Sequence, residues 1–170
     1  EDPSLIIYYP VRVLQNHLIV TNGDQTDTIF DFLSQGKTME EALATRCFEP
    51  DAPLFTPRIS VLFTFYGGTF DYKLSILKAA DAEGAHCTRE YFCYEPAAGA
   101  GHFIHTYRCD GNPPPSFAGE PEPVEVPNDI DDFTGEIWKN LHADNKISLF
   151  VRYVDLASGE TQTRILNKNV

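Results

Sequence analysis

The sequence predicts a mainly antiparallel β domain, either a β-sandwich or a flattened barrel, of seven to nine strands with two or three short helices. Two observations support this prediction. One is a hairpin pattern around Gly67-Gly68, and the other is a composition of 12 Phe and 8 Tyr against 1 Trp and 1 Met, which favours strands over helices. A chain of 170 residues is about the size of one domain, so we expect a single domain over residues 1–170.

The strongest pattern is the hairpin. Gly67-Gly68 can adopt the positive φ angles of a two-residue turn, and apolar and polar residues alternate on both sides of it. A one-residue shift in register would place apolar side chains opposite polar ones, so the pattern predicts the register as well as the turn. The predicted opposing pairs are Ile59 with Ile76, Val61 with Leu74, Phe63 with Tyr72, Phe65 with Phe70, Ser60 with Ser75 and Thr64 with Asp71.

Elements before the hairpin follow from prolines, turn residues and apolar spacing. Pro10 lacks a backbone donor and separates two strands, and the apolar period then changes from two to about 3.6, which predicts helices. Thr38-Met-Glu-Glu41 is a capping box. The predicted order is strand Leu5–Tyr9, strand Val11–Val20, turn Asn22-Gly23-Asp24, helices near 27–35 and 39–46, and connecting loop Glu49–Pro57.

After the hairpin the chain alternates strand-like and irregular segments. Small residues predict a turn between two strands, prolines predict an extended loop, and apolar residues at helical spacing predict one further helix. The predicted order is strand His86–Glu95, loop Pro96–Gly101, strand His102–Cys109, a proline-rich acidic loop at about 110–128, helix Asp129–His142 capped by Asn128 or Asp129, and a second hairpin of Lys146–Asp155 and Glu160–Asn167.

The cysteines predict an oxidising compartment, because four is an even number and their spacing does not suit a metal. The alternative is four reduced thiols in a cytosolic protein. Cys87 and Cys93 would lie roughly 20 Å apart on one extended strand, too far for a disulfide. Two connectivities remain. We prefer Cys47–Cys93 with Cys87–Cys109, since Cys87 and Cys109 would oppose each other in a hairpin centred on Ala98. The other is Cys47–Cys87 with Cys93–Cys109.

Charge restricts the partners. The formal net charge of −12 disfavours nucleic acid and anionic membranes, and no apolar run approaches the roughly 18 residues of a membrane helix. Between Arg108 and Lys139 there is no Lys or Arg, and the carboxylates there predict a binding surface for a basic protein partner. The alternatives are a solvated loop and a calcium site, although Phe133 breaks the EF-hand pattern. The eight carboxylates are Asp110, Glu120, Glu122, Glu125, Asp129, Asp131, Asp132 and Glu136.

No motif predicts a catalytic residue, a metal site or a cofactor. On a strand, His102 and His105 would point to opposite faces, as would the neighbours His86 and Cys87. The sequence lacks a Gly-x-Ser-x-Gly elbow and a phosphate-binding glycine loop. We therefore expect a secreted, non-enzymatic protein that recognises a protein partner through its sheet face and acidic loop. The alternatives are a barrel-type carrier of a small apolar ligand and a small secreted hydrolase.

Overall fold

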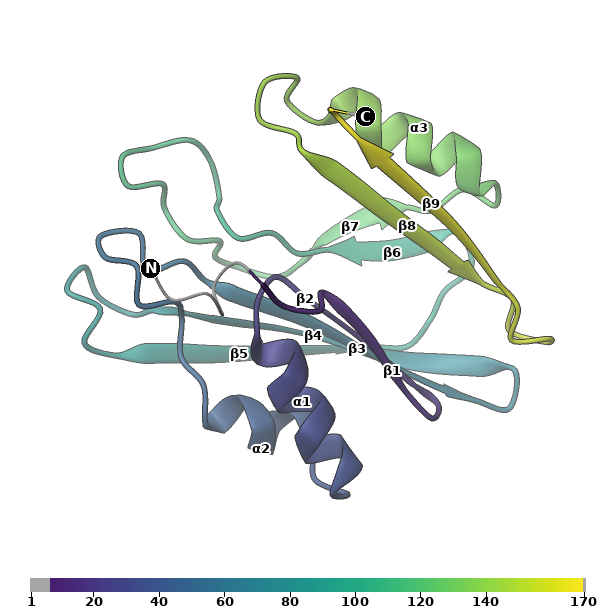
Figure 1. The fold of residues 1–170 in the computed structure, drawn as a ribbon, viewed down its shortest axis with the longest axis horizontal. Helices are drawn as coiled ribbons and strands as arrows, with labels where there is room; N and C mark the ends of the chain where they lie inside the picture. The colour runs from purple at the N-terminus through teal and green to yellow at the C-terminus, as the bar shows by residue number, and fades with distance from the viewer. Residues whose placement is uncertain (1–6, 170) are drawn as a thin grey trace. The chain divides into compact units, whose positions relative to one another are not determined.

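The computed structural model of the protein describes residues 7–169 and has the mainly β, antiparallel architecture with three helices that the sequence predicts. Within these residues no sheet closes into a barrel. The elements, labelled in Figure 1, are β1 (Val11–Leu14), β2 (His17–Thr21), α1 (Gln25–Ser34), α2 (Met39–Ala44), β3 (Arg58–Tyr66), β4 (Thr69–Ala79), β5 (Cys87–Tyr94), β6 (Ala100–Phe103), β7 (Glu122–Glu125), α3 (Ile130–Asn140), β8 (Ser148–Val154) and β9 (Thr161–Asn167).

The described chain divides into two compact units. The first contains residues 7–96 and 102–122, and the second contains residues 97–101 and 123–169. β6 and β7 pair in a two-stranded sheet where the chain passes between the units. The single domain over residues 1–170 stays a prediction.

The first unit is built on a five-stranded antiparallel sheet in the order β1-β2-β3-β4-β5. Its central hairpin has the predicted register, from Arg58 opposite Leu77 to Tyr66 opposite Thr69. Gly67 and Gly68 both have positive φ angles, 54° and 78°. Glycine adopts such angles without the strain that a residue with a side chain would incur. The alternation of residues on both sides of the turn was therefore sufficient to fix the pairing.

The N-terminal strands differ from the prediction. The segment Val11–Val20 is not one strand but two, because a tight turn places Leu14 opposite His17. Gln15 has a positive φ of 52° in this turn, a conformation that few residues other than Gly adopt. A glutamine at this position therefore does not predict a turn. Of the strand predicted at Leu5–Tyr9, residues 5 and 6 lie outside the described residues, and residues 7–9 are not in a strand.

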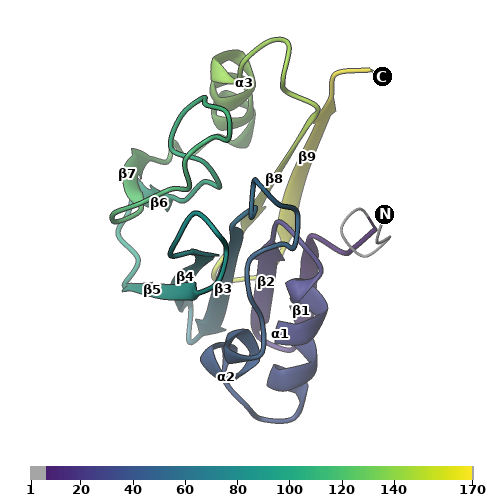
Figure 2. The ribbon, with the colours of Figure 1, turned by 90° about the vertical axis from the view of Figure 1, so that its left-hand side faces the viewer.

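Helices α1 and α2 cover one face of the five-stranded sheet, as Figure 2 shows from the side. The capping box at the start of α2 is confirmed, since the Thr38 and Glu41 side chains each accept the other's backbone N–H. The apolar residues buried between helices and sheet are Ile19, Ile29, Met39, Ala42, Leu43, Leu62 and Leu77. The opposite face carries a second core that includes Tyr72, Leu74, Ile76, Ile104 and Phe117.

Two serines are buried on the helix-covered face. Ser60 and Ser75 oppose each other across β3 and β4, and neither hydroxyl oxygen has a hydrogen-bond partner among the described residues. A buried hydroxyl without a partner loses its hydration and gains nothing in return. Ser75→Ala is therefore expected to raise the free energy of unfolding by about 1 kcal/mol in urea denaturation.

The matched control for this prediction is Ser34→Ala, whose hydroxyl is exposed and bonds only the carbonyl of Asp31. Its effect should stay within about 0.5 kcal/mol. A clear loss of stability in Ser75→Ala would show that the hydroxyl does have a partner.

The second unit contains the antiparallel pair β8–β9, with the predicted hairpin confirmed, and helix α3. Asp129 caps α3 by accepting hydrogen bonds from the backbone N–H groups of Asp131 and Asp132, as the sequence suggested. The helix packs on the hairpin: the rings of Phe133 and Tyr153 lie 6.2 Å apart.

The predicted disulfides are wrong. All four cysteines are free thiols. The hairpin that should have opposed Cys87 and Cys109 does not form, because β5 pairs only with β4, where Cys93 lies opposite Lys73. β6 is shorter than the predicted strand His102–Cys109, since it ends at Phe103 and pairs with β7 instead.

Candidate active site at the start of β3

A cluster of polar side chains gathers where β2 ends and β3 begins. The antiparallel pairing of these strands puts Thr21 opposite Ser60, so the residues after β2 lie beside the residues that lead into β3. Two segments thus converge: the turn 22–25, which opens α1, and the loop 46–57, which follows α2. All of these residues belong to the first unit.

Asn22 and Gln25 fix the turn against β3. The amide of Asn22 donates to the carbonyl of Pro57 at 2.9 Å, and its oxygen accepts from the backbone N–H of Ile59 at 2.8 Å. Gln25 is fully buried and donates to the carbonyl of Ile59 at 3.1 Å and to Asn22 Oδ1 at 3.0 Å. A buried amide with its hydrogen bonds made in this way holds a rigid geometry.

Arg58, the first residue of β3, lies at the centre of the cluster with a side chain only 5% exposed. Its Nη1 atom donates to Asp24 Oδ1 at 2.5 Å and to Gln25 Oε1 at 2.8 Å, and Glu49 Oε1 is 3.7 Å away. Its Nε atom is buried and has no partner within residues 7–169. One donor of this buried guanidinium is therefore unpaired among the described residues.

Gly23 leaves the space that this arrangement needs. A Cβ atom built at position 23 would lie 2.6 Å from Arg58 Nη1, 2.6 Å from Gln25 Oε1 and 3.2 Å from Glu49 Oε1. All three atoms belong to the cluster itself. A residue with any side chain would therefore push the site apart, which explains a glycine in this turn.

Glu49 is the group best suited to transfer a proton. Its side chain is 13% exposed, and burial raises the pKa of its carboxyl above the ordinary value, against the opposing charge of Arg58. Asp51 and Asp24 raise this pKa further, and Arg46 lowers it. Burial and the charge of Glu49 also raise the pKa of the Tyr8 phenol. A carboxyl group with a raised pKa keeps its proton to a higher pH than an exposed glutamate does, which suits it to act as an acid as well as a base.

The loop that carries Glu49 is held at both ends. The backbone N–H of Glu49 donates to the carbonyl of Thr56 at 2.9 Å, and the backbone N–H of Thr56 donates to Asp51 Oδ1 at 2.7 Å. The Thr56 hydroxyl also contacts Asp51, and it lies 2.8 Å from the hydroxyl of Tyr107. The three prolines of Glu49–Pro57 therefore belong to an ordered loop that closes on itself.

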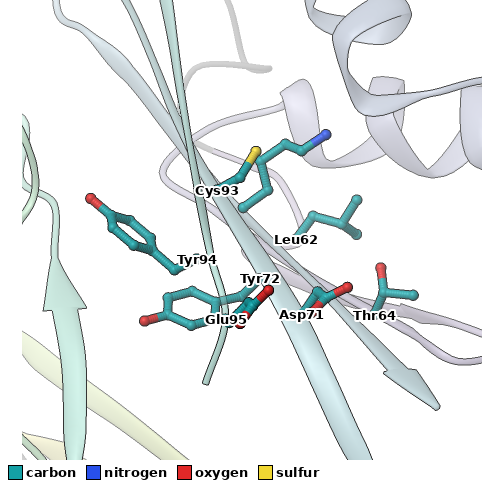
Figure 3. A pocket seen from close by; sticks show the side chains of 8 residues that line it. Leu62, Thr64, Asp71, Tyr72, Cys93, Tyr94 and Glu95 are labelled. Atoms are coloured by element: carbon teal, nitrogen blue, oxygen red, sulfur yellow. The ribbon is translucent and has the colours of Figure 1, made fainter. Parts of the chain in front are cut away.

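A separate open hollow of about 480 Å³ lies further along the sheet (Figure 3). Figure 3 shows Leu62 and Cys93 on one side of the strands and Tyr72 and Tyr94 pointing to the other. Leu62 is four residues beyond Arg58, roughly 13 Å along β3, so the polar cluster is not part of this hollow. Its lining residues are Leu62, Thr64, Asp71, Tyr72, Lys73, Cys93, Tyr94 and Glu95.

The predicted acidic residues do not form one loop, although all eight are exposed. Asp110 and Glu120 lie in irregular chain, Glu122 and Glu125 in β7, and the remaining four at the start of α3 or along it. The boundary between the two units falls after Glu122. Within the second unit Asp131 pairs with Arg164 at 2.5 Å. That these carboxylates contact a basic partner stays a prediction.

The two histidines of the strand-like segment have different neighbours. His102 stacks on Tyr94 with ring centroids 3.5 Å apart and contacts the Tyr72 hydroxyl through Nδ1 at 2.6 Å. His105 packs against Phe117. Within the part of the chain that the structure describes, no group of three or more His, Cys, Asp or Glu side chains could hold a metal ion, and no helix is long and apolar enough to cross a membrane.

Sequence reasoning missed the cluster. It took Asn22-Gly23-Asp24 as a turn and Glu49–Pro57 as a connecting loop, and both statements describe the backbone without the side chains. One signal was present: Arg58 is the single charged residue of its predicted strand, and a charge that is buried there requires nearby carboxylates as partners. The charged residues nearest to it in the two irregular segments are Asp24, Glu49 and Asp51.

A buried carboxyl with a raised pKa, placed beside a buried arginine, is the type of site that enzymes use for proton transfer. The comparisons with known proteins agree with this class. The sequence model of the family described as IMP cyclohydrolase-like protein matches residues 1–160, and the chain therefore belongs to that family.

One curated relative is named IMP cyclohydrolase and comes from Methanopyrus kandleri. It is 35% identical over 99 residues, which cover 49% of this chain and 50% of the relative. The chain thus spans about half the length of the curated relative that it matches.

Family membership corrects the predicted function. The expectation of a secreted recognition protein without catalytic activity is wrong, as are the carrier and secreted-hydrolase alternatives, because the family and the relative are named for an enzyme that acts on IMP. The extracellular localisation and the disulfides inferred from four cysteines are overturned with it. The error arose because an even number of cysteines was taken as a sign of compartment, whereas here they are free thiols.

Proposed function

We propose that this protein catalyses a cyclohydrolase reaction on the six-membered ring of IMP, with Glu49 as the group that moves the proton. The proposal is supported by membership of the IMP cyclohydrolase-like family and by one observation above all: a largely buried carboxyl whose pKa is raised, next to a buried arginine. The sequence contains no nucleophile motif such as a Gly-x-Ser-x-Gly elbow, so acid–base catalysis is the simplest chemistry for this site.

Ring closure of this kind joins a carboxamide nitrogen to a formyl carbon and releases one water, and ring opening adds that water back. In the closing direction the nitrogen must lose a proton as it attacks, and the oxygen of the former formyl group must gain protons before it leaves as water. A single carboxyl group can perform both steps in turn, first as base and then as acid. A raised pKa makes Glu49 suitable for both roles.

Arg58 complements Glu49 in this mechanism. During attack, negative charge develops on the formyl oxygen, and a preorganised donor in a water-poor site stabilises such charge. The Nε atom of Arg58 is buried and has no hydrogen-bond partner in the described part of the chain, while Nη1 is held by Asp24 and Gln25. We assign the guanidinium of Arg58 to the reacting oxygen, and its Nη1 contacts with Asp24 and Gln25 to fixing its orientation.

The proposal is tested with the purified chain and two measurements. Incubation with IMP, or with the formamido-imidazole-carboxamide nucleotide that its ring opening gives, should interconvert the two compounds, as followed by chromatography with absorbance detection. Titration calorimetry with IMP should show binding. A folded chain that neither binds IMP nor converts either compound would overturn the proposal.

A further inference from the structure

We propose that Arg89 on β5 is a positioning residue of the candidate active site: its guanidinium holds the carbonyl groups at the end of α2 and thereby aims Arg46 at Asp24. The inference rests on the proposed function for its catalytic consequence. Its structural part, the fixing of Arg46 by Arg89, is independent of the reaction.

The contacts of Arg89 all go to one short segment. Its Nε atom donates to the carbonyl of Leu43 at 3.1 Å, and its Nη2 atom donates to the carbonyl of Arg46 at 2.5 Å and to that of Ala44 at 3.5 Å. Three carbonyl groups within four residues are thus bound by one side chain from a different element. The planar fork of an arginine suits this arrangement, whereas a lysine provides one ammonium group.

The end of α2 needs such a partner. The last carbonyl groups of a helix have no N–H partner within the helix, and a cation there interacts favourably with the helix dipole. The last turn of α2 has no basic residue of its own. Arg89 supplies this charge from the neighbouring strand and sets the direction in which residues 45–49 leave the helix.

That direction determines the surroundings of Glu49. Arg46 reaches back to Asp24 at 2.5 Å, and Asp24 in turn holds Arg58. Only Cys47 and Phe48 separate Arg46 from Glu49, so a shift of the segment moves both. The charged and titratable groups that act on Glu49 are Arg58, Asp51, Asp24, Arg46 and Tyr8. Of the two arginines, Arg46 is the one that Arg89 holds in place.

The test compares Arg89→Met, which removes every donor, with Arg89→Lys, which keeps the charge but not the fork. The readout is the pKa of the Glu49 carboxyl, followed by ¹³C NMR during a pH titration. Because the charge of Arg46 lowers this pKa, its displacement should raise the pKa in both variants, more in Met than in Lys. A role in stability alone would not move this titration.

The matched control is Arg12→Met. Arg12 also projects from a strand towards a helix on the same unit, where it pairs with Asp27 and lies 3.4 Å from the Phe30 ring centroid, but it contacts none of the carbonyl groups at the end of α2. The pKa of Glu49 should be unchanged in this variant. If Arg89→Lys and Arg89→Met leave the pKa of Glu49 unaltered, or if Arg12→Met shifts it equally, the inference is wrong.

Activity then separates this inference from the proposed function. If both are correct, kcat/KM for IMP ring chemistry falls in Arg89→Lys by up to about 100-fold, with a shift of the pH profile in the same direction as the NMR titration. A shifted titration in a chain without any cyclohydrolase activity supports the positioning role and contradicts only the proposed function. If the pKa of Glu49 does not shift in a chain that has cyclohydrolase activity, the positioning role is contradicted and the proposed function is supported.

Discussion

Glu49→Gln is expected to lower kcat for the IMP ring reaction by about 10²- to 10⁴-fold, the range typical of a lost general acid–base group. Glutamine keeps the shape of the side chain but cannot exchange a proton. IMP binding, measured by calorimetry, should change little, because the substitution leaves the hydrogen bonds of Arg58 to Asp24 and Gln25 in place. Loss of kcat with binding retained separates a catalytic role from a structural one.

The same variant has a predictable effect on stability. Because the folded-state pKa of Glu49 is raised above its ordinary value of 4.5, the native state binds more protons than the unfolded state in the interval between these two values. The wild-type protein therefore loses stability as the pH rises through that interval, and Glu49→Gln does not. The variant should gain in relative stability towards neutral pH, as measured by urea denaturation at several pH values.

Glu83→Gln is the matched control, since Glu83 is exposed and belongs to the same unit. Neither its activity nor the pH dependence of its stability should differ from those of the wild type. A Glu49→Gln enzyme with at least a tenth of the wild-type kcat would remove Glu49 from the mechanism.

Gly23→Ala is expected to reduce the free energy of unfolding by about 1–3 kcal/mol and to impair activity. The new methyl group would lie 2.6 Å from both Arg58 Nη1 and Gln25 Oε1. These two atoms are buried and joined by a hydrogen bond. Either these side chains move and lose their hydrogen bonds, or the turn shifts away from β3. Both outcomes displace the guanidinium that we assign to the substrate. Thermal and urea denaturation measure the loss of stability, and the IMP assay measures the loss of activity.

Gly135→Ala provides the opposite control. Gly135 lies inside α3, and a Cβ atom there would meet no heavy atom within 4 Å. Alanine favours a helix over glycine by about 0.5–1 kcal/mol, so this variant should be slightly more stable than the wild type. If Gly23→Ala behaved like Gly135→Ala, the tight packing around Arg58 would be disproved.

Local patterns in the sequence predicted local structure well. The β3–β4 hairpin, the capping box of α2 and the cap of α3 each depend on residues close together in the chain, and each is confirmed. The partner of β6 could not be predicted in the same way, because β7 lies almost twenty residues further on, beyond an irregular proline-rich segment. Choosing between β5 and β7 as neighbours requires knowledge of long-range contacts.

The candidate site escaped prediction for a related reason. Its residues come from a turn, a loop and the first position of a strand, and no spacing rule connects Asp24, Glu49 and Arg58. Only the pairing of β2 with β3 brings them together. Motif searches detect groups that are close in sequence, whereas a candidate site assembled by sheet register leaves only an unexplained arginine at a buried position.

The sharing of Asp24 between two arginines has an evolutionary consequence. One oxygen of this carboxylate accepts from Arg46 and the other from Arg58, so the three side chains form one connected unit. Residues linked in this way show non-additive effects on substitution. Once one arginine has been replaced, Asp24 keeps only the other as a partner. The loss of stability caused by a second substitution therefore depends on the first. Descendants of this sequence should therefore replace the three positions together or not at all, while the exposed carboxylates of α3 drift independently.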